Sequence, residues 1–276
     1  MAENSEKELR RIFSLLDDPD ENIVLNAMAE LLSREEELGT LPGEFQESDD
    51  PVMRKRIHQL QAALTLRRRR KYFLARLYDP QADFLDILVE LHLQWFDNDS
   101  RPEVEALLAS FVVAFMCEQP TSLEDIMGFM IRHNFSAESE TTLKPENYCI
   151  GSVMTEHAGS GALLAALCSH LVPAEAGLAL GQFGEDFVVY DQKYRVLVPA
   201  KNWQILEDAD KKQIRPRDLR DLIRYCSANL FSAAVNSDSF RYVLTIAQAH
   251  CGSDDDTILN FLPYPFHPPE DTDREP

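Results

Sequence analysis

Hydrophobic residues recur at helical spacing through the first 135 residues. In Ser5–Leu16 the apolar side chains follow intervals of three and four residues, which place them on one face of a helix. The Asp17–Asp20 segment, with its proline, is expected to end this helix and to start the next. The same spacing predicts helices over Ile23–Leu32, Val52–Tyr78, Asp83–Phe96, Arg101–Glu118 and Ser122–Asn134. A bundle of helices is therefore predicted for residues 1–135.

The pattern changes after residue 145. The run PENYCIGSVMTEHAGSGALLAALCSHL is largely apolar and contains a small Gly159-Ser160-Gly161 turn, expected to be flexible, before its last helix. Three short strand-like runs follow it: GLALGQF, EDFVVYD and KYRVLVPA. A buried central helix followed by an antiparallel meander is predicted. The expected fold class is α+β and mostly helical, with a small antiparallel sheet packed on that helix.

The last part of the chain again has helical periodicity. Arg215–Leu230 and Ser239–His250 are predicted to form a helical hairpin. From Tyr264 the chain is rich in proline and acidic residues, and it is expected to be disordered or extended. The predicted organisation is a helical region (1–135), a core (136–210), a hairpin (211–262) and a tail (263–276).

The overall composition restricts the possible environments and partners. The 276 residues carry a net charge of −20, which keeps a protein soluble and repels nucleic acid and anionic membranes. The N-terminal run MAENSEKELRR is too polar for a signal peptide, and the sequence offers no membrane-spanning run. Five cysteines are widely separated, an odd number that indicates reduced thiols. A cytoplasmic protein that binds neither nucleic acid nor membrane is expected.

The predicted helix Val52–Tyr78 contains nine basic residues and no acidic residue, so the remainder of the chain carries about −29 (−20 minus +9). The bases include Arg67, Arg68, Arg69 and Arg70. Three interpretations remain open: a solvated face balanced by acidic neighbours, a docking face for an acidic partner or phosphorylated ligand, and a nucleic-acid surface. We retain the first, because nucleic-acid binding would be opposed by the other charges.

The central run resembles the SirB-type family of non-classical transglutaminase-like proteins. The family's proline, asparagine, Val-Leu pair, glycine and final leucine align without a gap with Pro145, Asn147, Val153, Met154, Gly159 and Leu164. The family continues with a G-H-F-L-V-R-Y strand and an I-D-P strand end. EDFVVY and LVP occupy those places in this chain.

The resemblance implies a thiol-enzyme scaffold without its chemistry. Active members carry a cysteine at the helix N-terminus, a histidine on the next strand and an orienting aspartate. Here Asp186 replaces the histidine, Val198 replaces the aspartate, and no cysteine lies between Ser160 and Leu163. The expected function is non-catalytic protein binding without a cofactor. Contacts are expected at a groove around Ser160 and Asp186, which includes Asn147, Gly159 and Gly161, and at the basic helix and the terminal hairpin.

Alternatives remain at this stage. A residual cysteine hydrolase or transferase would use Cys149 with His157, whereas a purely helical scaffold would have no sheet between residues 178 and 199. The Ser160 hydroxyl and nearby N–H groups could bind an anion, although a simple helix cap is favoured.

His92, His133 and Cys168 are interpreted as packing or surface residues. The histidines and cysteines do not cluster at ligand spacing, so no metal is expected. The oligomeric state is left open.

Overall fold

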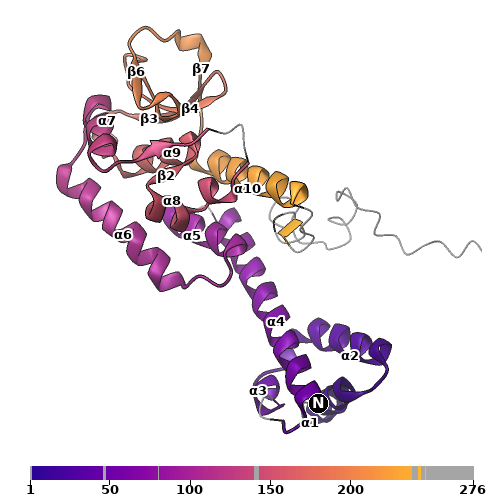
Figure 1. Cartoon of the computed structure of the whole chain (residues 1–276). Coiled ribbons are helices and arrows are strands. Elements are labelled where there is room, and N and C mark those ends of the chain that lie inside the picture. The colour runs from indigo at the N-terminus through magenta and orange to yellow at the C-terminus, as the bar shows by residue number, and fades with distance from the viewer. Residues whose placement is uncertain are drawn as a thin grey trace, which may run out of the picture. The chain divides into compact units, whose positions relative to one another are not determined.

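The chain folds into two compact units, Met1–Tyr72 and Phe73–Pro276, which divide within one helix. The computed structural model describes residues 2–45, 48–79, 81–139 and 143–237, together with positions 242, 243 and 246 (Figure 1). These residues are mostly helical and include one five-stranded antiparallel sheet, which confirms the predicted fold class. The predicted boundary at residue 135 falls inside the second unit.

The first unit is a small helical bundle. It contains α1 (Ala2–Ser14), α2 (Glu21–Ser33), α3 (Leu41–Phe45) and most of α4 (Pro51–Tyr78). The Asp20 carboxylate accepts a hydrogen bond from Asn22 N at 2.9 Å and so caps α2, in the turn where the sequence predicts a new helix. The buried core of this unit contains Leu9, Phe13, Leu16, Leu31, Ile57 and Leu60.

The second unit has six further helices within its described part. They are α5 (Phe84–Trp95), α6 (Arg101–Glu118), α7 (Leu123–Arg132), α8 (Ile150–Glu156), α9 (Gly161–Leu171) and α10 (Leu219–Asn236). The bounds of α6 are those predicted. Ser122 and Asp125 form a capping box that starts α7 one residue after the predicted start. Helix α9 is apolar on all sides and lies in the centre of the core.

The sheet has the strand order β6-β5-β4-β3-β7. The three predicted strands are β3 (Ala179–Phe183), β4 (Asp186–Tyr190) and β5 (Val196–Val198), and they form the predicted meander. The outer strands β6 (Gln204–Leu206) and β7 (Ile214–Pro216) were not predicted. A separate parallel pair joins β1 (Ser136–Ala137) to β2 (Ala158–Gly159). The sheet shows that the purely helical alternative is wrong.

The two faces of the sheet belong to different clusters. Residues Leu180, Phe187, Val189 and Leu197 join the core that contains α9. Residues Val188, Val196, Val198 and Ile214 form a smaller cluster on the other face. This division follows from strand geometry, in which successive side chains point to opposite faces.

The C-terminal prediction is only partly covered by the described residues. The first predicted hairpin helix begins later than expected, because Arg215 belongs to β7 and Asp218 caps α10. The second predicted helix and the tail lie outside the described residues, apart from three positions. Two of these, Val243 and Ile246, are buried in the core of the second unit.

Candidate functional site

The N-terminus of α9, where the resemblance places the nucleophile, is closed by its own hydrogen bonds. The Ser160 side chain is fully buried, and its Oγ accepts a hydrogen bond from Leu163 N at 3.1 Å. Ser160 N donates to the carbonyl oxygen of Asn147 at 2.8 Å. Because the hydroxyl and this N–H are used internally, the geometry corresponds to the helix cap and not to the anion site.

The two glycines beside Ser160 allow close packing. A Cβ atom at Gly159 would lie 2.7 Å from Val153 Cγ2, and one at Gly161 would lie 3.2 Å from the Cβ and N atoms of Ala200. Neither glycine has a left-handed backbone conformation. Glycine therefore suits these two positions because the neighbouring atoms are close, so that a side chain at Gly159 would displace Val153 and one at Gly161 would crowd Ala200.

The other two predicted positions lie on a different face of the sheet. Val198 belongs to the smaller cluster, and Asp186 pairs across the ladder with Phe183, which packs against that cluster. Leu163 is buried in the larger core with α9. The Asp186 carboxylate lies 3.7 Å from Lys201 Nζ. The predicted groove around Ser160 and Asp186 is thus not assembled, because Ser160 is buried and Asp186 shares the face of Val198.

Asn147 stabilises this closed arrangement through its backbone. Its carbonyl oxygen receives the hydrogen bond from Ser160, and its side chain is 4% exposed. The Nδ2 atom has no hydrogen-bond partner within the described part of the chain. Asn147 therefore positions the start of α9 from the 3₁₀ turn Pro145–Tyr148.

The alternative pair, Cys149 and His157, is not brought together. Cys149 directly precedes α8 and His157 directly follows it, so about 10 Å of helix lies between them. Burial raises the pKa of the Cys149 thiol well above its usual value, and electrostatic interactions with Cys226, Glu146 and Asp99 raise it further. The His157 ring donates through Nδ1 to the His133 carbonyl oxygen at 2.8 Å and stacks on Phe135. This geometry gives no support to a Cys149 nucleophile activated by His157.

His92 is a packed core histidine. Its Nε2 atom lies 3.0 Å from the Asp99 carboxylate, and its side chain is 1% exposed. Burial lowers the pKa of His92, although the hydrogen bond to Asp99 opposes that shift. A Cβ atom at Gly151 would lie 2.7 Å from the imidazole ring, so α8 packs directly against it. These contacts support the sequence interpretation of a packing residue.

The thiols should differ strongly in reactivity. Cys117 is exposed, whereas Cys149, Cys168 and Cys226 are buried, and burial raises the pKa of Cys168 as well. We expect iodoacetamide to alkylate Cys117 in the folded protein at pH 7 and the three buried thiols only after unfolding, as measured site by site by peptide mass spectrometry. The Cys117→Ser variant is the control and should lose the rapid reaction at that position. Alkylation of Cys149 faster than that of Cys117 would contradict the closed site.

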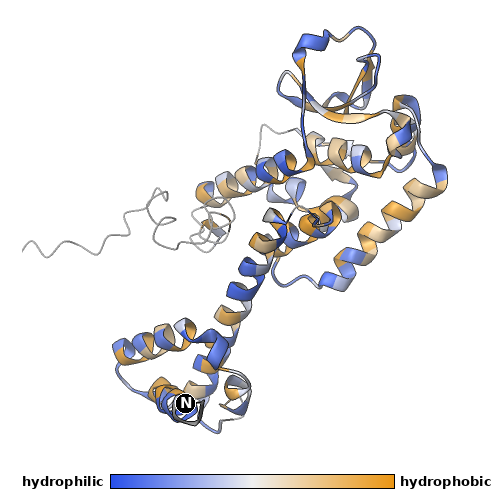
Figure 2. Ribbon diagram, turned by 180° about the vertical axis from the view of Figure 1, so that it is seen from behind, coloured by the Kyte–Doolittle hydropathy of each residue, from blue (hydrophilic) through white to orange (hydrophobic). Residues whose placement is uncertain are grey.

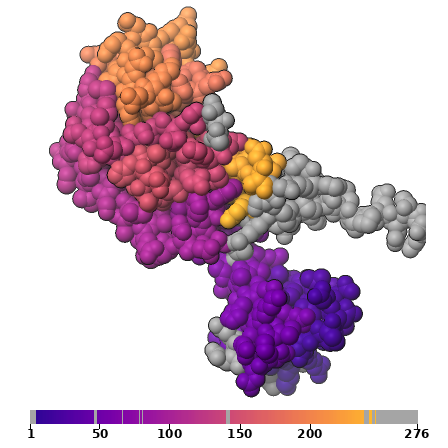
Figure 3. All heavy atoms as spheres, in the orientation of Figure 1, coloured from indigo at the N-terminus to yellow at the C-terminus, as the bar shows by residue number. Residues whose placement is uncertain are grey.

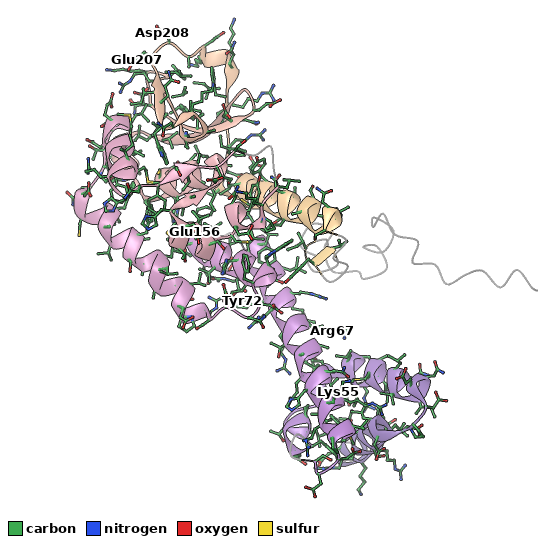
Figure 4. All side chains as sticks on the ribbon, viewed as in Figure 1. Lys55, Arg67, Tyr72, Glu156, Glu207 and Asp208 are labelled. Atoms are coloured by element: carbon green, nitrogen blue, oxygen red, sulfur yellow. The ribbon has the colours of Figure 1, made fainter. Side chains whose placement is uncertain are left out.

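The basic residues of α4 are partly neutralised inside the first unit. Arg68 Nε donates to Glu35 Oε1 at 2.9 Å, and Lys71 Nζ lies 3.4 Å from Glu35 Oε2. Arg67 donates to the Leu32 carbonyl oxygen at 2.8 Å. Figure 4 labels Lys55 and Arg67 along this helix. Arg69 and Arg70 are half-buried. The retained interpretation, a basic face balanced by acidic neighbours, is consistent with these contacts.

A surface that the sequence analysis missed lies on α6. Between Glu105 and Glu118 the helix has no charged residue, and several of its apolar side chains point outward. Leu107 is 41% exposed, Val113 61% and Met116 54%. We define the α6 face by its exposed residues: Ala106, Leu107, Ala109, Ser110, Val113, Met116 and Cys117. Figure 2 colours most of this helix orange or white, and Figure 3 shows α6 and α7 at the surface of the second unit.

A small cavity adjoins the α6 face. It has a volume of about 230 Å³ and is lined by Leu107, Ser110, Phe111, Ala114, His133, Phe135, Met154 and His157. On the neighbouring helix, Ile131 is 52% exposed. Contiguous exposed apolar surface of this kind marks interaction sites in soluble proteins. The available sequence signal was the uncharged run ALLASFVVAFMC, within the helix predicted over Arg101–Glu118.

The comparisons give no relative. No family model, curated protein or solved structure matches this chain. Within the described ranges no group of three or more histidine, cysteine, aspartate or glutamate residues is placed to hold a metal ion. In the same part of the chain no helix is both long and apolar enough to cross a membrane. The function must therefore be argued from the geometry of the chain itself.

Proposed function

We propose that this chain is a non-catalytic protein with a transglutaminase-like core, which acts by binding another protein through the α6 face. The exposed and uncharged α6 face is the observation that carries the proposal. The first turn of α9 supports the non-catalytic part, because Ser160 is buried as a cap and no thiol lies there. Four free cysteines among the described residues support a reducing compartment such as the cytosol.

The charges around the α6 face favour a different protein over a second copy. Glu103 and Glu105 lie at one end of the face and Glu118 at the other, where Glu105 pairs with Arg101 and Glu118 with Arg132. A second copy would bring another net charge of −20 towards this face, so like charges on the two chains would repel. The expected partner surface is apolar at its centre and carries a net positive charge, because such a surface complements the apolar α6 face and the negative charge of the chain.

Two glutamates introduced on the α6 face should weaken this binding about 30-fold or more. Val113→Glu/Met116→Glu puts charges at the centre of the face, where hot-spot losses of about 2 kcal/mol or more correspond to about 30-fold weaker binding. Both positions are more than half exposed, so the free energy of unfolding should change by only about 0.5 kcal/mol. The measurement is quantitative co-purification from the native cytosol, followed by titration with the purified partner.

The matched control carries the same two charges in the first unit. Leu25 is 65% exposed and Val52 48%, so Leu25→Glu/Val52→Glu adds equal charge and removes exposed apolar side chains elsewhere. We expect a partner protein to co-purify equally with the wild type and with this control, and to be absent from the α6 variant. Equal amounts of the partner protein bound to both variants would contradict the proposal.

A further inference from the structure

A second concave site lies in the second unit, on elements other than those of the α6 face. The groove has a volume of about 530 Å³ and lies between the starts of α5 and α10, the end of α9 and β3. Eight of its twelve lining residues are apolar: Ala82, Phe84, Ile87, Leu178, Ala179, Leu180, Leu219 and Ile223. It shares no lining residue with the α6 face. Pockets of about 300–1,000 Å³ with apolar walls and a few polar groups are typical small-molecule sites.

Two arginines supply the cationic part of this groove. Arg217 donates through Nε and Nη2 to the Gln182 side-chain oxygen, at 3.1 and 2.6 Å. Its Nη1 lies 3.7 Å from the Asp221 carboxylate. Arg220 donates through Nη2 to the backbone carbonyl oxygen of Asp79 at 2.7 Å. Within the described residues, no carboxylate lies within ion-pair distance of Arg220.

The local charge differs from that of the whole chain. The lining residues carry two arginines and one aspartate, a net charge of +1 (two minus one), in a chain of −20. The single acid, Asp218, is exposed, and its carboxylate accepts a hydrogen bond from Asp221 N at 2.7 Å, so that it caps α10. A half-buried guanidinium beside apolar side chains is stabilised when a carboxylate pairs with it. The planar guanidinium of arginine can donate to both oxygens of a carboxylate at once.

We propose that this groove binds a small amphiphilic monocarboxylate. Its apolar body lies on Phe84, Ile87 and Ile223, and its carboxylate pairs with Arg220 and Arg217. Asp218 beside the arginines disfavours a doubly charged phosphate, since the second negative charge would be repelled. The ligand is independent of the partner protein proposed for the α6 face.

Octanoate is the probe for this proposal, with 1-octanol as its uncharged counterpart. Isothermal titration calorimetry on the full chain should show one saturable octanoate per chain and binding of octanol at least about tenfold weaker, from the loss of a charge-assisted contact. Arg220→Gln should weaken octanoate binding about tenfold, down to the level of octanol. Arg224→Gln is the matched control, because Arg224 is on the same helix but 66% exposed and outside the groove. That variant should bind octanoate within about twofold of the wild type.

A second variant tests the apolar half of the site. Ala179→Trp fills the groove from β3 and should weaken both octanoate and octanol about tenfold or more. Circular dichroism reports whether each variant is folded. If Ala179→Trp does not fold, Arg220→Gln still decides the question, because Arg220 holds only a backbone carbonyl.

Several results would overturn the proposal. The first is that the wild type does not bind octanoate at millimolar concentration. The second is that octanol binds as tightly as octanoate, and the third is that Arg224→Gln weakens octanoate binding as much as Arg220→Gln does. The chain's own acidic tail is the competing occupant, since Phe266 is followed by Glu270, Asp271, Asp273 and Glu275. A full-length variant with these four acids changed to amides should bind octanoate as the wild type does. If that variant bound octanoate tenfold more tightly than the wild type, the tail would be the occupant of the groove, and the proposal of a free ligand would be overturned.

Discussion

Replacement of Trp203 by alanine should lower the free energy of unfolding by about 3–5 kcal/mol, the range for large aromatic side chains removed from a core. The Trp203 side chain is fully buried in the core that contains α9. Its Nε1 donates to the Phe135 carbonyl oxygen at 2.8 Å, which joins the segment before β6 to the segment before β1. The substitution therefore removes both packing and a buried hydrogen bond.

Urea unfolding followed by circular dichroism measures this loss without depending on tryptophan fluorescence. Trp203→Phe is the control variant, because it keeps most of the apolar volume and removes only the donor to Phe135. Its expected cost is about 1–3 kcal/mol, the penalty for a buried carbonyl without its partner. A cost for alanine no larger than that for phenylalanine would show that Trp203 does not pack as described.

Arg101→Met should destabilise the protein by a similar amount, about 3–5 kcal/mol, because it leaves a buried acid without its cation. Arg101 begins α6 and bonds through Nη2 to Glu90, whose side chain is 4% exposed. Its Nη1 lies 3.1 Å from Asp86 and 2.8 Å from Glu105. Glu90 has the least access to solvent among these acids, so it should account for most of the cost.

A double-mutant cycle isolates that contribution. Adding Glu90→Gln to Arg101→Met removes the buried charge and should restore about 1 kcal/mol or more in urea unfolding. Arg132→Met is the control, because Arg132 is 61% exposed and pairs with Glu118 at the surface. Exposed pairs contribute about 0–1 kcal/mol. Additive costs for Arg101→Met and Glu90→Gln would contradict a coupled buried pair.

The N-terminus of α9 is buried and hydrogen-bonded, so the groove that the sequence resemblance implies around Ser160 is not formed. Aligning motifs gives the chain positions of four residues: Ser160, Leu163, Asp186 and Val198. Alignment does not tell where each side chain lies in the folded protein. Val198 lies with Val188 and Val196 in the smaller cluster, whereas Leu163, on α9, is buried in the larger core. The resemblance remains a proposal about the scaffold, and the absence of a thiol in the first turn of α9 supports the non-catalytic function.

Local sequence patterns determined most of the helices and the three central strands. The periodic apolar residues of α6 predicted its bounds, and Ser122 predicted the start of α7 because its hydroxyl satisfies backbone N–H groups at that end. The strand-like runs predicted β3, β4 and β5. Strand β5 was recognised because its three residues are all apolar, whereas β6 begins with Gln204 and β7 contains Arg215 and Pro216. Pro216 argues against a strand in the sequence, and it is tolerated because β7 lies at an edge of the sheet.

Only the tertiary structure decided which of these surfaces are covered. The first residue of α9, Gly161, lies beside a segment about forty residues further along the chain, because a Cβ atom at Gly161 would be 3.2 Å from Ala200. The apolar residues of α6 occur on several sides of the helix, and their sequence does not tell which side meets the core. Arg217 and Arg220 likewise become the cationic end of a groove only because α10 begins beside β3 and α5. Spacing along the chain sets which side chains share a face, whereas contacts between distant segments set which face remains open to a ligand or partner.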